Sequence, residues 1–163
     1  MLSNFAFADR IAAEHLAVMR EFTHAVPVRV GELAKALGLK VVEATLPLSI
    51  SGMIRPDESG AFVIRVNRFE PKERQRFTIA HEIAHFLLHR SLITRGVVDS
   101  TLYRSKLSSR LEAEANRLAA DIIMPRQLVS QQLAEIPPGI EDPDAYLAEK
   151  FRVSRAAMDI RTS

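Results

Sequence analysis

The sequence predicts an α+β fold, in which a small antiparallel β-sheet packs against helices. Helical patterns occupy both ends of the chain, and three short strand patterns follow one another within residues 40–66. Strands grouped together and helices grouped together are typical of α+β domains rather than of alternating α/β folds. The length of 163 residues and the hydrophobic content of 47% suit one compact soluble domain with a sizeable core.

The first part of the chain is predicted to form two helices and three strands. Apolar residues recur at helical spacing over residues 8–23, and a second helix over residues 29–37 is closed by Gly38. Residues 40–44 are expected to form a strand. Residues 49–55 and 61–66 flank a segment rich in turn-forming residues, so we expect these two strands to pair as a hairpin.

The second part is predicted to be helical. Pro71 suits the first turn of a helix that runs to about His89 or Arg90, and a polar loop is expected over residues 91–108. A second long helix over residues 109–124 is ended by Pro125. We therefore expect a first domain over residues 1–125 and a helical extension over 126–163, with a break at 137–139, a short helix at 145–150 and another helical start after residue 154.

Composition excludes several classes of site. The net charge is only +2 despite a pI of about 9.2, which is weak support for nucleic-acid binding. Cys is absent, so disulfides and thiolate metal sites are excluded. No stretch approaches the roughly 20 apolar residues that a membrane span needs, and the charged N-terminal region does not resemble a signal peptide. We expect a cytoplasmic protein without membrane contact.

The most informative motif is His81-Glu82-Ile83-Ala84-His85, an H-E-x-x-H sequence within an apolar helical stretch. Positions i and i+4 share one helix face, so both imidazoles can reach one metal ion. Glu82 lies one residue further round the helix, where its carboxylate can act as a general base without being a ligand. This pattern is typical of zinc peptidases.

A catalytic zinc site usually has three protein ligands, and the third must come from elsewhere in the chain. Three histidines on one straight helix span about 12 Å, so we expect His89 to be a helix-end histidine rather than a ligand. The other candidates are His15, His24, Asp99, Glu112, Glu114 and Asp121.

Glu112 is the preferred third ligand and Glu114 is the alternative. Asn116 lies at i+4 from Glu112, where it could hydrogen-bond a ligand histidine or steady Glu112, as metal sites commonly require. Glu114 has apolar Leu118 at the same spacing. If no metal were bound, both carboxylates would simply be exposed helix charges.

Residues 77–89 and 112–125 together resemble the ImmA/IrrE family of metallopeptidases, whose second motif is approximately E-x-E-A-N-x-F-A-x-x-L-L-M-P. The resemblance is strong over residues 62–125, with Leu118 in place of Phe and Ile122-Ile123 in place of Leu-Leu, and it is weaker in the tail over residues 147–161. It implies a zincin-like fold, with His81, His85 and Glu112 as ligands of zinc, or alternatively manganese. It also implies an endopeptidase that cleaves XRE-type helix-turn-helix repressors and so relieves repression of mobile-element or stress genes.

Some functional assignments stay open at the level of the sequence. Tyr103 and Arg104, between the two motif helices, are candidate donors to a developing oxyanion. Residues 151–154 resemble the turn of a helix-turn-helix, but few basic residues surround them, so direct DNA binding is not expected. The alternative functions are a regulatory protein that binds such a repressor without cutting it, and a toxin–antitoxin partner.

Overall fold

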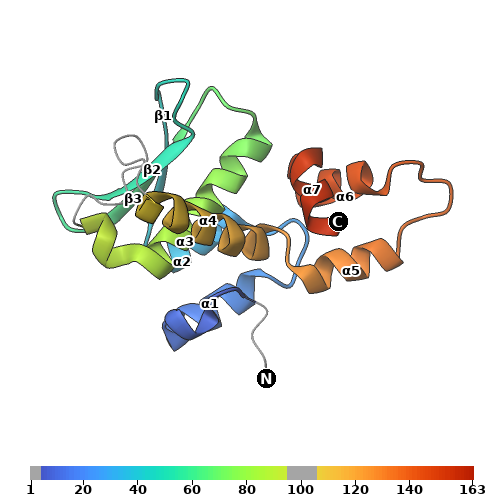
Figure 1. Cartoon of the computed structure of the whole chain (residues 1–163), viewed down its shortest axis with the longest axis horizontal. Helices are drawn as coiled ribbons and strands as arrows, with labels where there is room; N and C mark the ends of the chain where they lie inside the picture. The colour runs from blue at the N-terminus through green and yellow to red at the C-terminus, as the bar shows by residue number, and fades with distance from the viewer. Residues whose placement is uncertain (1–4, 95–105) are drawn as a thin grey trace.

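The computed structural model describes residues 5–94 and 106–163, which form an α+β fold (Figure 1). In chain order the described elements are η1 (Ala8–Arg10), α1 (Ala13–Phe22), α2 (Val30–Ala36), β1 (Lys40–Ala44), β2 (Gly52–Pro56), β3 (Phe62–Asn67), α3 (Lys72–Thr94), α4 (Lys106–Ile123), α5 (Arg126–Ala134), α6 (Pro143–Phe151) and α7 (Arg155–Thr162). The predicted fold class is therefore confirmed. None of the described helices is long and apolar enough to cross a membrane.

The sheet is mixed, not wholly antiparallel as predicted. Strands β2 and β3 form the predicted antiparallel hairpin, with Ile54 opposite Ile64. Strand β1 pairs with β3 in parallel, so the strand order is β1-β3-β2. The sequence shows three strand patterns but not their partners, and the chain reaches β2 only after passing across the end of β3. As a result β3 is central and β2 lies at an edge of the sheet.

Asn67, at the end of β3, holds the connection between β1 and β2 in place. Its side chain is almost fully buried, and its Nδ2 donates to the carbonyl oxygens of Leu46, Pro47 and Ile50 at 3.0–3.2 Å. Buried amide groups need such partners because an unpaired one costs free energy. This side chain therefore fixes the segment that leads into β2.

Helix α3 packs closely on the sheet through small and apolar residues. Ala80, Ile83 and Ala84 are fully buried in the core. At Gly52 the backbone of β2 approaches α3 so closely that an added Cβ would lie 2.4 Å from Thr78 Cγ2 and 2.7 Å from the Arg65 carbonyl oxygen. Gly52 thus allows the edge strand to lie directly against the helix that carries the H-E-x-x-H motif.

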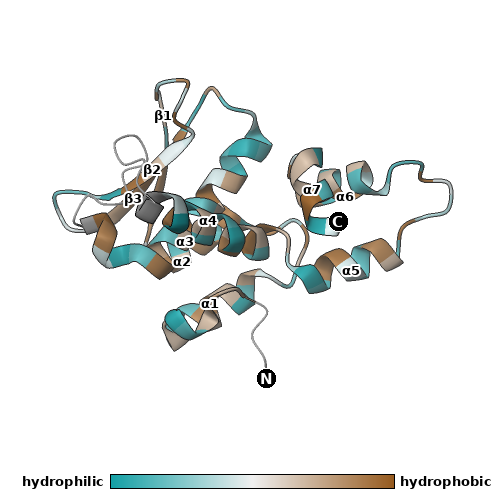
Figure 2. Cartoon of the chain, viewed as in Figure 1, coloured by the Kyte–Doolittle hydropathy of each residue, from teal (hydrophilic) through white to brown (hydrophobic). Residues whose placement is uncertain are grey.

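The long helices extend further than predicted. Helix α3 continues to Thr94, but His89 has non-helical backbone angles (φ −128°, ψ 24°), so a kink lies where the helix was expected to end. Helix α4 begins at Lys106, three residues before the predicted start. Hydrophilic and hydrophobic segments follow one another along its ribbon in Figure 2, as expected of a helix with one buried face.

Three helices form the C-terminal part, and Figure 1 shows them grouped at the end away from the sheet. The sequence predicted helices near α6 and α7 but not α5, which begins directly after Pro125. Leu147, Phe151 and Met158 from α6 and α7 are fully buried in the common core. The boundary between residues 125 and 126 stays a prediction.

A buried ion pair joins α7 to α4. Arg161 donates to Asp121 Oδ1 at 2.7 Å and to the carbonyl oxygen of Met124 at 2.8 Å. The second carboxylate oxygen of Asp121 accepts a hydrogen bond from the backbone N–H of Ala6 at 2.7 Å. One side chain on α4 therefore holds both the N-terminal segment and the last helix.

Candidate metal centre

The facing sides of α3 and α4 bring two imidazoles and one carboxylate together. His81 Nε2 lies 3.1 Å from Glu112 Oε2, and His85 Nε2 lies 2.7 Å from Glu112 Oε1. One ligand atom from each of the three residues lies within 4.8 Å of the others. The helical spacing of four residues places both imidazoles on one face of α3, and α4 supplies the carboxylate from the opposite side.

The other ring nitrogen of each histidine is also engaged. His81 Nδ1–H donates to Asn116 Oδ1 at 2.8 Å, which leaves the Nε2 lone pair directed towards Glu112. His85 Nδ1 contacts His89 Nδ1 at 2.9 Å. Two imidazole nitrogens and a carboxylate oxygen, with outer partners that orient the rings, form a donor set that fits a zinc ion.

The charge state of the centre follows from burial and hydrogen bonding. Burial alone would raise the pKa of Glu112, but its close contacts with the imidazoles of His81 and His85 outweigh burial and hold that pKa below its ordinary value. Burial lowers the pKa of His85, which favours the neutral imidazole that a metal requires. For His81, burial lowers the pKa, but contacts with Glu112 and Glu82 more than offset it.

Glu82 lies beside the cluster and has a different environment. Its side chain is buried, and burial raises the pKa of its carboxyl group to about 7. A carboxylate with a pKa near neutrality can both accept and return a proton at physiological pH. Glu82 is thus chemically distinct from Glu112, which stays ionised.

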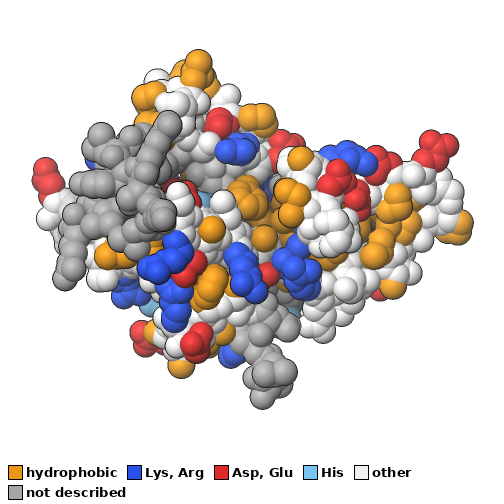
Figure 3. Space-filling view, in the orientation of Figure 1, with side chains coloured by type: hydrophobic (Ala, Val, Ile, Leu, Met, Phe, Trp, Pro, Cys, Tyr) orange, Lys and Arg blue, Asp and Glu red, His pale blue; other side chains and the backbone are white. Residues whose placement is uncertain are grey.

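The centre opens into a cleft of about 570 Å³. The face of the molecule drawn in Figure 3 has hydrophobic side chains in its middle, between the part that carries the sheet and the C-terminal helices. The lining residues come from the start of β2 and the segment before it, α3, α4 and α7: Ser49, Ile50, Ser51, Gly52, Arg74, Phe77, Thr78, His81, Glu82, Glu112, Asn116, Ala120, Met124, Ala157 and Ile160. The contribution of α7 was not anticipated from the sequence.

The remaining candidate residues lie outside the cluster of ligand atoms. Glu114 contacts His89 and Arg10, and Asp121 pairs with Arg161. His15 packs its ring against Phe86, and His24 is exposed. His89 is buried but contacts His85 rather than the shared ligand position. Asp99, Tyr103 and Arg104 lie outside the described residues.

Comparison with protein families agrees with this geometry. The profile described as the IrrE N-terminal-like domain, Peptidase_M78, matches residues 34–163. The chain belongs to this family. The resemblance stated from the two sequence motifs is therefore confirmed, and the matched region contains α3, α4 and the cluster between them. Residues 1–33 precede the matched region.

The individual relatives share only low sequence identity with this chain. Metallopeptidase ImmA of Bacillus subtilis (strain 168) is 30% identical over 87 residues, which cover 53% of this chain and 48% of the relative. The radiation response metalloprotease IrrE of Deinococcus radiodurans is 33% identical over 76 residues, which cover 47% of this chain and 23% of that protein. An immunity region protein of Bacillus phage phi105 is 28% identical, with 61% of each chain covered. The chain spans less than two thirds of each of these relatives.

The fold is also found among solved structures. A transcriptional regulator of Mycobacterium tuberculosis superimposes with a TM-score of 0.55 and 19% sequence identity. The superposition covers 93% of this chain and 47% of that protein. At this level of identity, the similarity describes the fold alone.

Proposed function

We propose that this member of the IrrE N-terminal-like family is a zinc-dependent endopeptidase. In this proposal His81, His85 and Glu112 hold the ion, and Glu82 is the general base. The observation that carries it is the convergence of the three ligand atoms within 4.8 Å, beside a buried carboxylate and at the wall of a cleft. Manganese is the alternative ion, since two imidazoles and a carboxylate suit several divalent metals.

The division of labour between the two glutamates follows from their surroundings. A bound zinc ion would acidify water and polarise a peptide carbonyl. Glu112, with its lowered pKa, supplies a permanent negative charge to the ligand set. Glu82, whose pKa is raised to about 7 by burial, accepts a proton as water attacks and returns it to the leaving amine.

The position of β2 at the edge of the sheet, beside the cleft, supports a protein substrate in an extended conformation. Strand β2 lies at an edge of the sheet and pairs with β3 on one side. Gly52, at the start of β2, lines the cleft. The backbone of an edge strand can pair with an added peptide strand. Such pairing would lay a flexible segment of a substrate across His81 and Glu82.

We propose that this substrate is a helix-turn-helix repressor of the XRE type and that the protein acts in the cytoplasm. The names of the relatives, which refer to an immunity region and to a radiation response, agree with a regulatory role. Direct DNA binding by the C-terminal helices is not favoured. Arg161 is buried against Asp121, and the exposed charge of Arg155 is offset by two neighbouring carboxylates, Asp142 and Asp159.

The test has a metal arm and a cleavage arm. Wild-type protein loaded with zinc and dialysed should retain one ion per chain, and Glu112→Ala should lose it. Glu82→Gln should retain the ion. Incubated with a purified candidate repressor, wild type should yield two fragments with one new N-terminus by mass spectrometry, whereas Glu82→Gln should leave the repressor intact.

The alternatives make different predictions in the same experiments. If the protein binds the repressor without cutting it, wild type and Glu82→Gln should relieve repression in cells to the same extent. A wild-type chain that retains no metal would refute the peptidase. A toxin–antitoxin partner would form a stable complex with the helix-turn-helix protein and leave both chains intact.

A further inference from the structure

A row of contacts leads from the metal centre to the N-terminal segment. His85 Nδ1 contacts His89 Nδ1 at 2.9 Å, and His89 Nε2 contacts Glu114 Oε1 at 2.8 Å. Both oxygens of Glu114 then accept from the guanidinium of Arg10, at 2.9 and 3.1 Å. The series begins at a proposed metal ligand and ends in η1, before the region matched by the family profile.

The number of N–H groups on the imidazoles of His85 and His89 determines which atom donates in each of these contacts. Two neutral imidazoles carry two N–H groups, and each of the three contacts His85–Glu112, His85–His89 and His89–Glu114 needs one. With only two protons, one contact would lack a donor. If a metal ion takes the place of the donor between His85 Nε2 and Glu112, two contacts remain for two protons.

Every polar atom in the row is then satisfied. His85 Nδ1–H donates to His89 Nδ1, and His89 Nε2–H donates to Glu114. The imidazole of His89 is neutral and acts as an acceptor on one side and a donor on the other. Both oxygens of the Glu114 carboxylate accept hydrogen bonds, because the guanidinium of Arg10 donates to each of them. This pattern selects the tautomer of His85 that exposes an Nε2 lone pair.

The row is shielded from water where it approaches the centre. The His89 side chain is 1% exposed, Glu114 is 17% exposed and Arg10 is 39% exposed. The kink at His89 changes the local backbone direction of α3 at the residue that bridges the two helices. The N-terminal segment is held on α4 a second time, where the N–H of Ala6 donates to Asp121.

We propose that His89, Glu114 and Arg10 are positioning residues that fix the tautomer and orientation of His85, so that the N-terminal segment completes the metal centre. This inference rests on the proposed function, because it takes His85 as a ligand. It extends the centre beyond the matched region and gives Glu114 a role that is not ligation.

The first test measures zinc affinity by competition with a chelator. His89→Ala and Glu114→Ala should each weaken binding by about 10- to 100-fold, the range typical of lost outer partners of metal ligands. Glu114→Gln retains an acceptor for His89 and should recover most of the affinity. Arg10→Ala should fall between wild type and Glu114→Ala. His15→Ala is a matched control, since His15 also packs on α3 but through Phe86 and Arg90.

The second test needs no substitution. Nitrogen chemical shifts of the zinc-loaded wild-type protein should show His85 protonated at Nδ1 and His89 protonated at Nε2. His89 protonated at Nδ1 would overturn the proposal, and so would unchanged zinc affinity in both His89→Ala and Glu114→Ala. Failure of the proposed function is distinguishable, because wild type itself would then bind no zinc or Glu112→Ala would bind it normally.

Discussion

Replacing Arg161 with Met tests how the last helix is held against the proposed active site. Arg161 and Asp121 form a buried pair whose side chains are 5% and 10% exposed. Met preserves much of the length and apolar volume of the arginine side chain. The substitution therefore removes mainly the positive charge and its two hydrogen bonds, to Asp121 and to the Met124 carbonyl.

The expected loss follows from what remains in the folded protein. Asp121 would keep one donor, the N–H of Ala6, but its charge would lie buried without a counter-ion. Removing one partner of a buried ion pair typically costs about 3–5 kcal/mol. For a protein of this size, that corresponds to a fall in Tm of roughly 6–20 °C.

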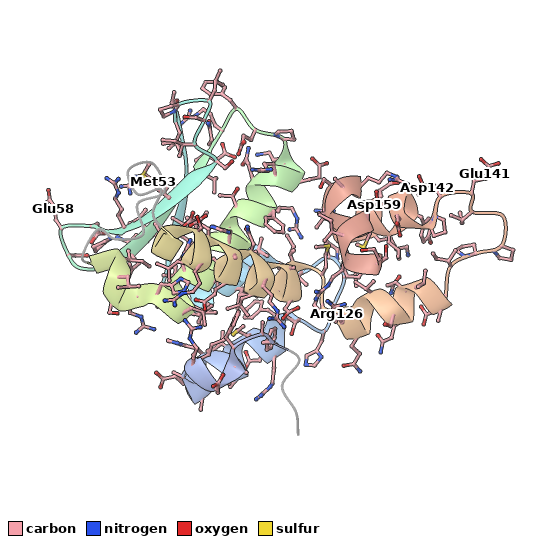
Figure 4. The ribbon with its side chains drawn as sticks, in the orientation of Figure 1. Met53, Glu58, Arg126, Glu141, Asp142 and Asp159 are labelled. Carbon is pink, nitrogen blue, oxygen red and sulfur yellow. The ribbon has the colours of Figure 1, made fainter. Side chains whose placement is uncertain are left out.

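Urea unfolding of the metal-free protein, followed by far-UV circular dichroism, measures this change. Arg155→Met is the matched control, because it is the same substitution on the same helix but in an exposed pair. Its partners Asp142 and Asp159 lie near one another on the outside of the C-terminal helices (Figure 4). The control should unfold near the wild-type midpoint, since exposed pairs contribute little.

The reasoning would be refuted if Arg161→Met and Arg155→Met unfolded at the same urea concentration. A loss in Arg161→Met should also reduce cleavage more than metal binding. The reason is that α7 contributes Ala157 and Ile160 to the cleft, while the ligands lie on α3 and α4.

Three further predictions concern single positions. Gly52→Ala should lower the free energy of unfolding by about 1–3 kcal/mol, since its Cβ would overlap Thr78. The control Gly31→Ala, on helix α2 with open space around it, should be neutral or stabilising. Glu82→Gln should stabilise the metal-free protein increasingly as pH rises from about 4.5 to 7, by up to about 3 kcal/mol, because the raised pKa of Glu82 makes its ionisation in the folded state unfavourable. Ser154→Ala removes the cap that accepts from Ala157 N–H and should cost about 1 kcal/mol.

Thermal and urea unfolding curves measure all three. A Gly52→Ala protein as stable as Gly31→Ala would show that β2 does not approach α3 closely. A difference in the free energy of unfolding between Glu82→Gln and wild type that stays constant with pH would contradict the burial of an ionisable carboxyl group. An unchanged Ser154→Ala protein would mean that the start of α7 is capped in another way.

Local patterns were enough to predict much of this protein. The i, i+4 spacing of His81 and His85 depends only on helix geometry, and the hairpin between β2 and β3 depends on turn residues close in sequence. The choice of Glu112 over Glu114 came from Asn116 at the next turn of the same helix and from the family motif. The structure brings Glu112 to the two histidines and pairs Asn116 with His81.

Other features were missed because their partners are distant in sequence. The parallel pairing of β1 with β3 depends on how the connection between β1 and β2 crosses the sheet, which Asn67 fixes from 17 to 21 residues away. Pro125 was interpreted only as the end of the helix over residues 109–124, within a chain expected to continue as a helical extension, whereas it also precedes the first residue of α5.

The amino-acid sequence by itself determined the fold class, the two motif helices and which side chains of each helix share a face. Periodicity within one element is set by backbone geometry and requires no knowledge of neighbours. Only the tertiary structure decided that α7 lines the cleft and that Arg10 reaches Glu114 across 104 residues of chain. Such contacts depend on which elements pack together, and packing is decided by the burial of the whole apolar core rather than by any local pattern.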